Sequence, residues 1–167
     1  MKDFKSKYSL EDSLILTSFD LVNFLTKNSE VMVRNSGLSV QQWLVLLQIV
    51  NDSNFPQPEL QSRGACSGVI SSEIADARGV SRPNISALVA ALLNKGMVEQ
   101  RQDAQDRRCK TLHITKKGLR TLEQIEPLRR QVNEDLFSEF TASELKAVHA
   151  FMQRWLQKLW HQEAPPG

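Results

Sequence analysis

Residues 70–101 read ISSEIADARGVSRPNISALVAALLNKGMVEQR, and this stretch decides the fold. It predicts a short helix to about Ala77, a break at Gly79 and a second helix that Ser81 caps, with Pro83 in its first turn. The buried stripe of the second helix recurs at helical spacing: Ile85, Leu88, Val89, Leu92 and Leu93. A short helix, a turn and a second helix form a helix-turn-helix.

A polar hairpin is predicted directly after this unit. Residues 97–101 and 111–114 have strand character, and the charged stretch 102–110 joins them. A helix-turn-helix with such a hairpin is a winged helix. We therefore predict a mainly α protein with a small β-wing.

Long helical segments flank the winged helix in a chain of 167 residues that we expect to form one domain, residues 1–167. The winged helix-turn-helix lobe is expected over 39–118, with an extended polar loop at 51–69. Residues 10–35 predict a helix that is apolar on several sides, and residues 120–162 supply further helices with an apolar stripe.

The positive charge of the chain is concentrated around the predicted hairpin. Residues 78–120 hold ten Lys and Arg against three Asp and Glu, a net charge of +7. The segments before and after it have net charges of −3 and −2. This distribution favours a surface that binds a polyanion, and a solvated basic patch is the alternative.

The N-terminal turn of the second helix carries the side chains best suited to reading DNA. Arg82 matches guanine and Asn84 matches adenine in the major groove, while Ser86 can donate to a phosphate. Ser81 is favoured as a helix cap over a DNA contact. The hairpin adds a second set of cations: Arg107, Arg108 and Lys110.

An acidic residue, Asp106, sits among these cations. We interpret it as a brace that pairs with a neighbouring arginine, for which Arg101 is the candidate, and holds the hairpin tip. An ordinary exposed turn is the alternative. If the tip is braced, Arg108 is placed to enter a minor groove, where the negative potential is enhanced.

Three stretches resemble the MarR (multiple antibiotic resistance) family of regulators: GLSVQQWLVLLQI at 37–49, the segment 70–101 quoted above, and DRRCKTLHITKKG at 106–118. The resemblance implies a homodimer joined by the terminal helices and bound to a pseudo-palindromic double-stranded DNA operator. It also implies a repressor released by a stress signal or a small aromatic or phenolic effector, with Trp43 as a candidate pocket residue. Arg82, Asn84 and Ser86 would then face the major groove.

Other chemistry is weakly indicated. Cys66 and Cys109 are expected to be free thiols, with a redox-sensing regulator as one alternative function. A winged-helix protein-interaction module without DNA binding is another. The sequence shows no catalytic constellation and no metal-ligand spacing, so we expect no enzyme activity, metal or cofactor. It shows no signal peptide and no apolar run that spans a bilayer, so we expect a cytoplasmic protein without membrane contact.

Overall fold

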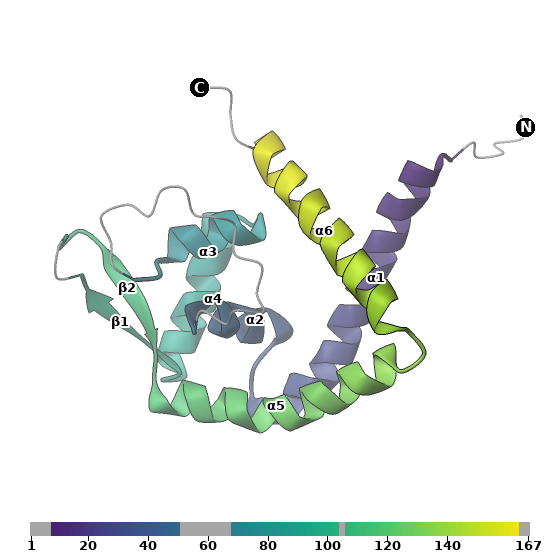
Figure 1. Ribbon diagram of the computed structural model, residues 1–167. Coiled ribbons are helices and arrows are strands. Elements are labelled where there is room, and N and C mark those ends of the chain that lie inside the picture. Colours follow the sequence, from purple (N-terminus) through teal and green to yellow (C-terminus); the bar gives the residue numbers. More distant parts are fainter. Residues whose placement is uncertain (1–7, 51–67, 104–105, 164–167) are drawn as a thin grey trace, which may run out of the picture.

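The computed structural model describes residues 8–50, 68–103 and 106–163, which form helices and a two-stranded sheet (Figure 1). The prediction of a mainly α winged helix with a small β-wing is confirmed. Most of the loop expected at 51–69 lies outside the described residues. In chain order the elements are α1 (Leu10–Val33), the short 3-10 helix η1 (Arg34–Ser36), α2 (Val40–Ile49), α3 (Ser71–Arg78), α4 (Arg82–Asn94), β1 (Val98–Gln102), β2 (Lys110–Ile114), α5 (Lys116–Phe137) and α6 (Ala142–Glu163).

Hydroxyl side chains set the start of four helices. The residue before each of α1, α2, α5 and α6 accepts a hydrogen bond from a backbone N–H in the first turn, which satisfies a donor that has no partner inside the helix. These residues are Ser9, Ser39, Thr115 and Thr141.

The turn between α3 and α4 depends on Gly79. Its φ of 59° lies in the left-handed region, where a side chain is strained. Ser81 occupies the cap position of α4, but its side chain accepts no capping hydrogen bond, so the expected cap at this residue is wrong. Pro83 lacks an N–H at the second helical position, which removes one of the two donors that such a cap uses. The Ser81 side chain therefore stays exposed.

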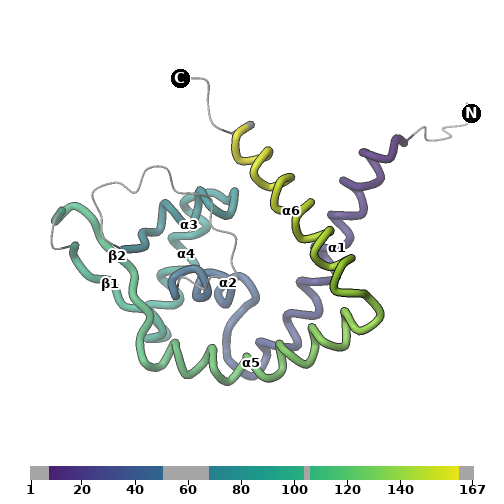
Figure 2. The backbone as a smooth tube through the Cα atoms, viewed as in Figure 1, coloured from purple at the N-terminus to yellow at the C-terminus, as the bar shows by residue number. Residues whose placement is uncertain are grey.

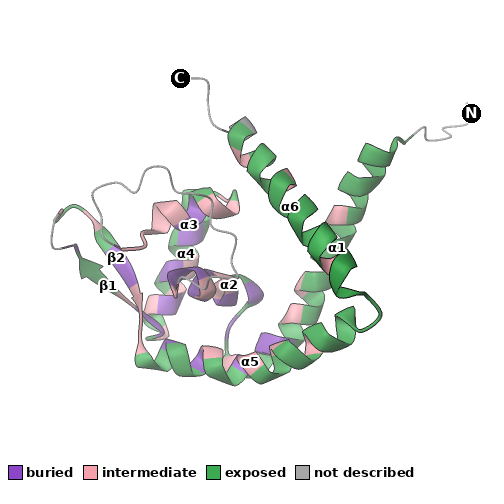
Figure 3. Ribbon diagram, in the orientation of Figure 1, coloured by how far each residue is buried: buried purple, intermediate pink, exposed green. Residues whose placement is uncertain are grey.

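The hydrophobic core is centred on the winged helix lobe, which comprises α2, α3, α4 and the two strands (Figure 3). It also includes Met32 and Val33 at the end of α1 and Ile125 of α5. Leu46, Ile85 and Leu92 are among the largest side chains that are fully buried. They come from α2 and α4, and Ile74 of α3 packs in the same cluster. The predicted apolar stripe of α4 thus packs against the rest of the lobe, and the opposite face of this helix is exposed to solvent.

The wing is an antiparallel hairpin whose base is closed by α5. Val98 pairs with Ile114 at the inner end, and Gln102 pairs with Lys110 at the outer end. Gly118 of α5 lies so close to this base that a Cβ atom on it would be 2.3 Å from the carbonyl oxygen of Met97. α5 then continues as one helix through Pro127 toward the region of α1 and α6 (Figure 2).

The terminal helices α1 and α6 diverge from their crossing like the arms of a V (Figure 1). Many of their large apolar side chains are exposed (Figure 3), among them Phe19 and Phe24 of α1 and Phe151, Leu156 and Leu159 of α6. A groove between the arms is lined by residues of both helices, including Leu14, Ile15 and Trp155. Within the described part of the chain, no helix is long and apolar enough to cross a bilayer.

Candidate nucleic-acid interface

The exposed face of α4 carries the side chains that the sequence assigns to base reading. Arg82, Asn84 and Ser86 are all exposed, while Ile85 and Val89 between and beyond them are buried. This alternation follows from the helical period, since the buried residues lie on the side toward α2 and α3. Beyond its first turn the exposed face of α4 has short side chains, because Ala87 and Ala90 are exposed as well.

Arg82 has a neighbour that the sequence analysis did not single out. A terminal nitrogen of its guanidinium lies 3.8 Å from the Oδ1 atom of Asp76, at the C-terminal end of α3. Both side chains are well exposed, so the ion pair is weak and leaves the guanidinium accessible. The contact spans the turn of the helix-turn-helix, between the end of α3 and the start of α4.

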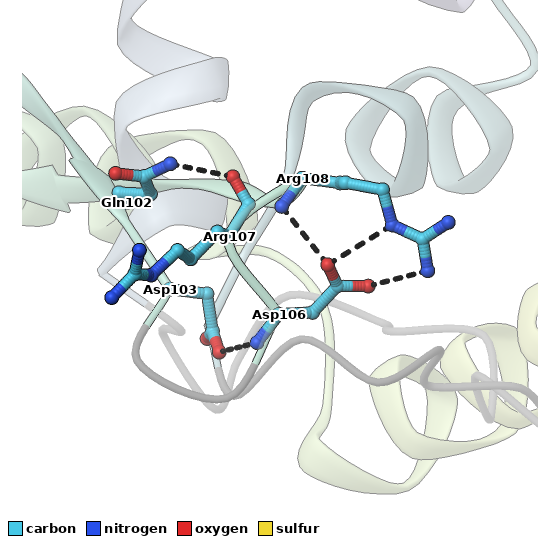
Figure 4. A network of polar contacts seen from close by, with 5 residues as sticks. All are labelled: Gln102, Asp103, Asp106, Arg107 and Arg108. Carbon is cyan, nitrogen blue, oxygen red and sulfur yellow. Dashed lines mark hydrogen bonds and ion pairs between the residues drawn. The ribbon is translucent and has the colours of Figure 1, made fainter.

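The wing tip is held by two aspartates (Figure 4). Asp103 is only 4% exposed, and its Oδ1 atom accepts the backbone N–H of Asp106 at 3.1 Å. Asp106 in turn accepts the backbone N–H of Arg108 at 2.9 Å. The backbone carbonyl of Arg107 accepts a hydrogen bond from the Gln102 amide at 2.7 Å. These bonds connect the last residue of β1 with the turn that precedes β2.

The carboxylate of Asp106 also contacts the guanidinium of Arg108. Oδ1 lies 3.3 Å from Nε, and Oδ2 lies 3.4 Å from a terminal nitrogen. The hydrogen bonds from the Arg108 backbone and side chain hold the pKa of Asp106 below its usual value. Asp106 is therefore ionised at neutral pH, and Arg108, with its side chain 92% exposed, projects from a defined turn.

The remaining cations of the wing lie on its surface. Arg107 and Lys110 are exposed. Arg101, the expected partner of Asp106, instead forms an ion pair with Glu99, two residues earlier in β1. Side chains at positions i and i+2 of a strand lie on the same face, so this pairing follows from the period of the strand. Of the two arginines, Arg108 is thus the one that contacts Asp106.

A hollow of about 210 Å³ lies between α2 and α5, away from the wing tip. We call it the α2–α5 hollow. Its apolar wall includes Trp43, Leu47 and Leu122, and its polar lining comes from α5: Glu123, Glu126 and Arg129. Trp43, the expected pocket residue, therefore does line a hollow while also belonging to the core.

The segment with this geometry matches a known family. Residues 36–108, which include α2, the helix-turn-helix and the wing tip up to Arg108, match the model described as the MarR family. Over this segment the chain is similar to the MarR family. The transcriptional repressor MprA of Escherichia coli K12 is 25% identical to it over 136 residues, which are 81% of this chain and 70% of MprA.

Solved structures of MarR-family regulators share the fold. MepR of Staphylococcus aureus, determined as a complex with DNA, is similar with a TM-score of 0.67 at 17% identity, covering 93% of this chain and 99% of that one. CouR of Rhodococcus jostii RHA1, determined with p-coumaroyl-CoA bound, has a TM-score of 0.72 at 19% identity, covering 90% and 96%. At these identities the likeness establishes the fold.

Further features of the site were missed or misread from sequence. The ion pair of Asp76 with Arg82 needs the fold, but the spacing of Asp103 and Asp106 was a readable signal for a turn held by an aspartate. Cys109 is disulfide-bonded, so the prediction of a free thiol is wrong for this residue. A disulfide joins residues that the fold brings together, which their sequence positions do not reveal. The other cysteine, Cys66, lies outside the described residues.

Proposed function

We propose that this protein is a homodimeric, sequence-specific DNA-binding regulator that acts as a transcriptional repressor in the cytoplasm. The observation that carries the proposal is the pairing of an exposed, polar α4 face with an ordered basic wing in one lobe. Arg82, Asn84 and Ser86 suit base edges and phosphates in a major groove. Arg108 suits the adjacent minor groove, and the net charge of +7 over residues 78–120 suits the backbone.

The homodimer is supported by the apolar surface of the terminal helices. A single chain leaves Phe19 and Phe24 of α1 exposed together with Leu156 and Leu159 of α6. Contiguous apolar surface of this kind is covered by a partner in stable proteins. A second copy inserting its own α1 and α6 into the V would bury these side chains around a two-fold axis. Two copies of α4 would then face two half-sites about one helical turn apart.

The α2–α5 hollow is the proposed effector site. Its tryptophan wall suits an aromatic body, phenolic or otherwise, and α5 connects this wall to the base of the wing. The structure of CouR is described with p-coumaroyl-CoA bound, and that of MepR with DNA, so similar folds accommodate a small molecule or a duplex. An effector that binds one arrangement of the dimer better than the other releases the operator.

The test is binding of the purified protein to the DNA upstream of its own gene, measured by fluorescence anisotropy at physiological ionic strength. A scrambled duplex of the same length and composition serves as the control. We expect a marked preference for the native duplex and a protected region with two-fold symmetry. Equal affinity for both duplexes would contradict the proposed function and favour a winged-helix protein-interaction module.

A second candidate function, redox control of DNA binding, is supported by the disulfide at Cys109. This residue follows Arg108 directly, and its backbone N–H donates to the Asp106 carbonyl at 2.9 Å. Reduction to thiols therefore changes a covalent restraint beside the wing arginine. Operator affinity measured with and without dithiothreitol tests this function, with Cys109→Ser as the reference. A reductant effect that persists in Cys109→Ser would exclude Cys109 as the sensor.

A further inference from the structure

The α2–α5 hollow has one strongly cationic group among its lining residues, and that group is already bound. The Nε atom of Arg129 donates to Glu126 Oε2 at 2.7 Å, and a terminal nitrogen donates to Glu126 Oε1 at 2.7 Å. Two parallel bonds of this kind form the strongest geometry between a guanidinium and a carboxylate. A ligand carboxylate or phenolate has to displace Glu126 to reach the same fork.

Glu126 is held in its charged form. The hydrogen bond from Arg129 holds the pKa of Glu126 below its usual value. Arg130 adds a longer contact to the same carboxylate, with its terminal nitrogen 3.4 Å from Oε1. The pair of Glu126 and Arg129 therefore persists at neutral pH and presents little net charge to a ligand.

Glu123 differs from Glu126 although it lines the same hollow one helical turn earlier. Its carboxylate forms no ion pair with any residue that the structure describes, and it is exposed. The charged group that a ligand can pair with at this hollow is therefore the negative carboxylate of Glu123. It lies beside an apolar wall that includes the indole of Trp43.

We propose that the α2–α5 hollow selects a monovalent organic cation with a compact aromatic or apolar body, whose charge lies beside Glu123 and whose body packs against Trp43 and Leu122. The inference rests on the proposed effector site and names its ligand class. An indole ring attracts a cation to its face, so the wall and the carboxylate favour the same charge. An anion should bind less well, because the carboxylate of Glu123 repels it and the guanidinium of Arg129 is already paired with Glu126.

Three small probes that share a benzyl or phenyl body separate charge from shape. They are benzyltrimethylammonium, neutral benzyl alcohol and anionic benzoate, each titrated into the full-length protein by isothermal titration calorimetry. We expect benzyltrimethylammonium to bind most tightly and to lose affinity as salt rises, because salt screens the pairing with an exposed carboxylate. It should also lower the affinity for the upstream DNA, which benzoate should leave unchanged.

Two variants test which carboxylate of the hollow affects ligand binding, and a third variant is the control. Glu123→Gln should weaken benzyltrimethylammonium by about fivefold, the upper range for a pair with an exposed carboxylate, and leave benzyl alcohol unchanged. Glu126→Gln removes the carboxylate that holds both nitrogens of Arg129 and should strengthen benzoate. Glu134→Gln removes the same charge from an exposed position of α5 that does not line the hollow, and should bind all three probes as the wild type does.

The outcomes separate this inference from the proposed function. If the unliganded protein prefers its upstream DNA but benzoate binds as tightly as benzyltrimethylammonium, the cation preference is overturned and DNA-binding regulation stands. A fivefold loss in both Glu123→Gln and Glu134→Gln would also overturn it, because the effect would then belong to overall charge. Binding of none of the probes overturns the inference too.

Discussion

Asp106 holds Arg108 by its backbone and by its side chain at once. The Oδ1 atom of Asp106 accepts the Arg108 backbone N–H at 2.9 Å and lies 3.3 Å from Nε of the same residue. Arg108 is otherwise surrounded by solvent. A long side chain that is already oriented loses less conformational entropy when it enters a DNA groove.

The first prediction concerns the sign of the effect of Asp106→Asn on operator binding. This variant removes a negative charge from the wing, so a carboxylate that only faced DNA would make binding tighter when lost. If Asp106 orients Arg108, binding should weaken despite the gain in net positive charge. Arg108→Ala should weaken binding and flatten its dependence on salt, because one phosphate-proximal cation is lost. Fluorescence anisotropy over a salt series measures both, and tighter binding by Asp106→Asn would exclude the orienting role.

The second prediction concerns pH. The pKa of Asp106 is lowered in the folded protein, so its interactions are fully present above the unfolded pKa of about 3.9 and are lost as pH falls through the lowered value. The ratio of operator affinities of the wild type and Asp106→Asn should therefore stay constant between about pH 5.5 and pH 8. Histidine protonation affects both proteins and cancels in this ratio. A ratio that falls toward pH 5.5 would contradict the assignment.

The third prediction assigns Arg82 to base reading. Arg82→Ala should cost about 1–3 kcal/mol on the native operator and relax the preference at one base pair of each half-site. Binding to a panel of single-base operator variants measures this. Asp76→Ala provides a comparison, because it removes the neighbour of Arg82 without removing the guanidinium. A loss that is equal on every duplex would make Arg82 a phosphate contact.

The fourth prediction concerns the terminal helices. Leu156→Asp combined with Leu159→Asp should yield monomers or aggregates, because an unpaired carboxylate is costly in an apolar interface. Gln157→Asp adds a charge on the opposite side of α6 and should remain dimeric. Sedimentation velocity at micromolar concentration distinguishes these states. A wild-type protein that sediments as a monomer would refute the dimer itself.

The fifth prediction concerns Gly118. Its missing Cβ atom would lie 2.3 Å from the Met97 carbonyl oxygen and 2.8 Å from the Ile114 side chain. Gly118→Ala should therefore lower the free energy of unfolding by at least about 2 kcal/mol, as overpacking does in cores. Urea denaturation measures the change, with Lys116→Ala at an exposed neighbouring position as the control. An unchanged midpoint would show that α5 shifts freely on the wing.

The elements of the helix-turn-helix and wing were predictable because their signals are local. The left-handed Gly79 and the helical spacing of Ile85, Val89 and Leu92 each depend on neighbours a few residues away. These signals also placed Arg82 and Arg108 on elements where they are exposed.

The features that escaped the sequence analysis depend on the fold or on competing partners. Ser81 has the position of a cap without its hydrogen bond, in a first turn where Pro83 supplies no donor. Arg101 was expected to pair with Asp106, but the period of the strand places Glu99 on the same face as Arg101. The disulfide of Cys109 depends on which residues the fold brings together.

α5 is one continuous helix of 22 residues, about 33 Å long, anchored at one end by the close contact of Gly118 with Met97. At that length a tilt of about 5° displaces the far end by about 3 Å. The contact of Gly118 with Met97 lies near the N-terminal end of α5, next to the part of this helix that lines the α2–α5 hollow. In the proposed homodimer, we expect a tilt of α5 relative to its lobe to change the separation of the two α4 helices. The spacing of the operator half-sites is therefore the quantity that such a tilt would affect.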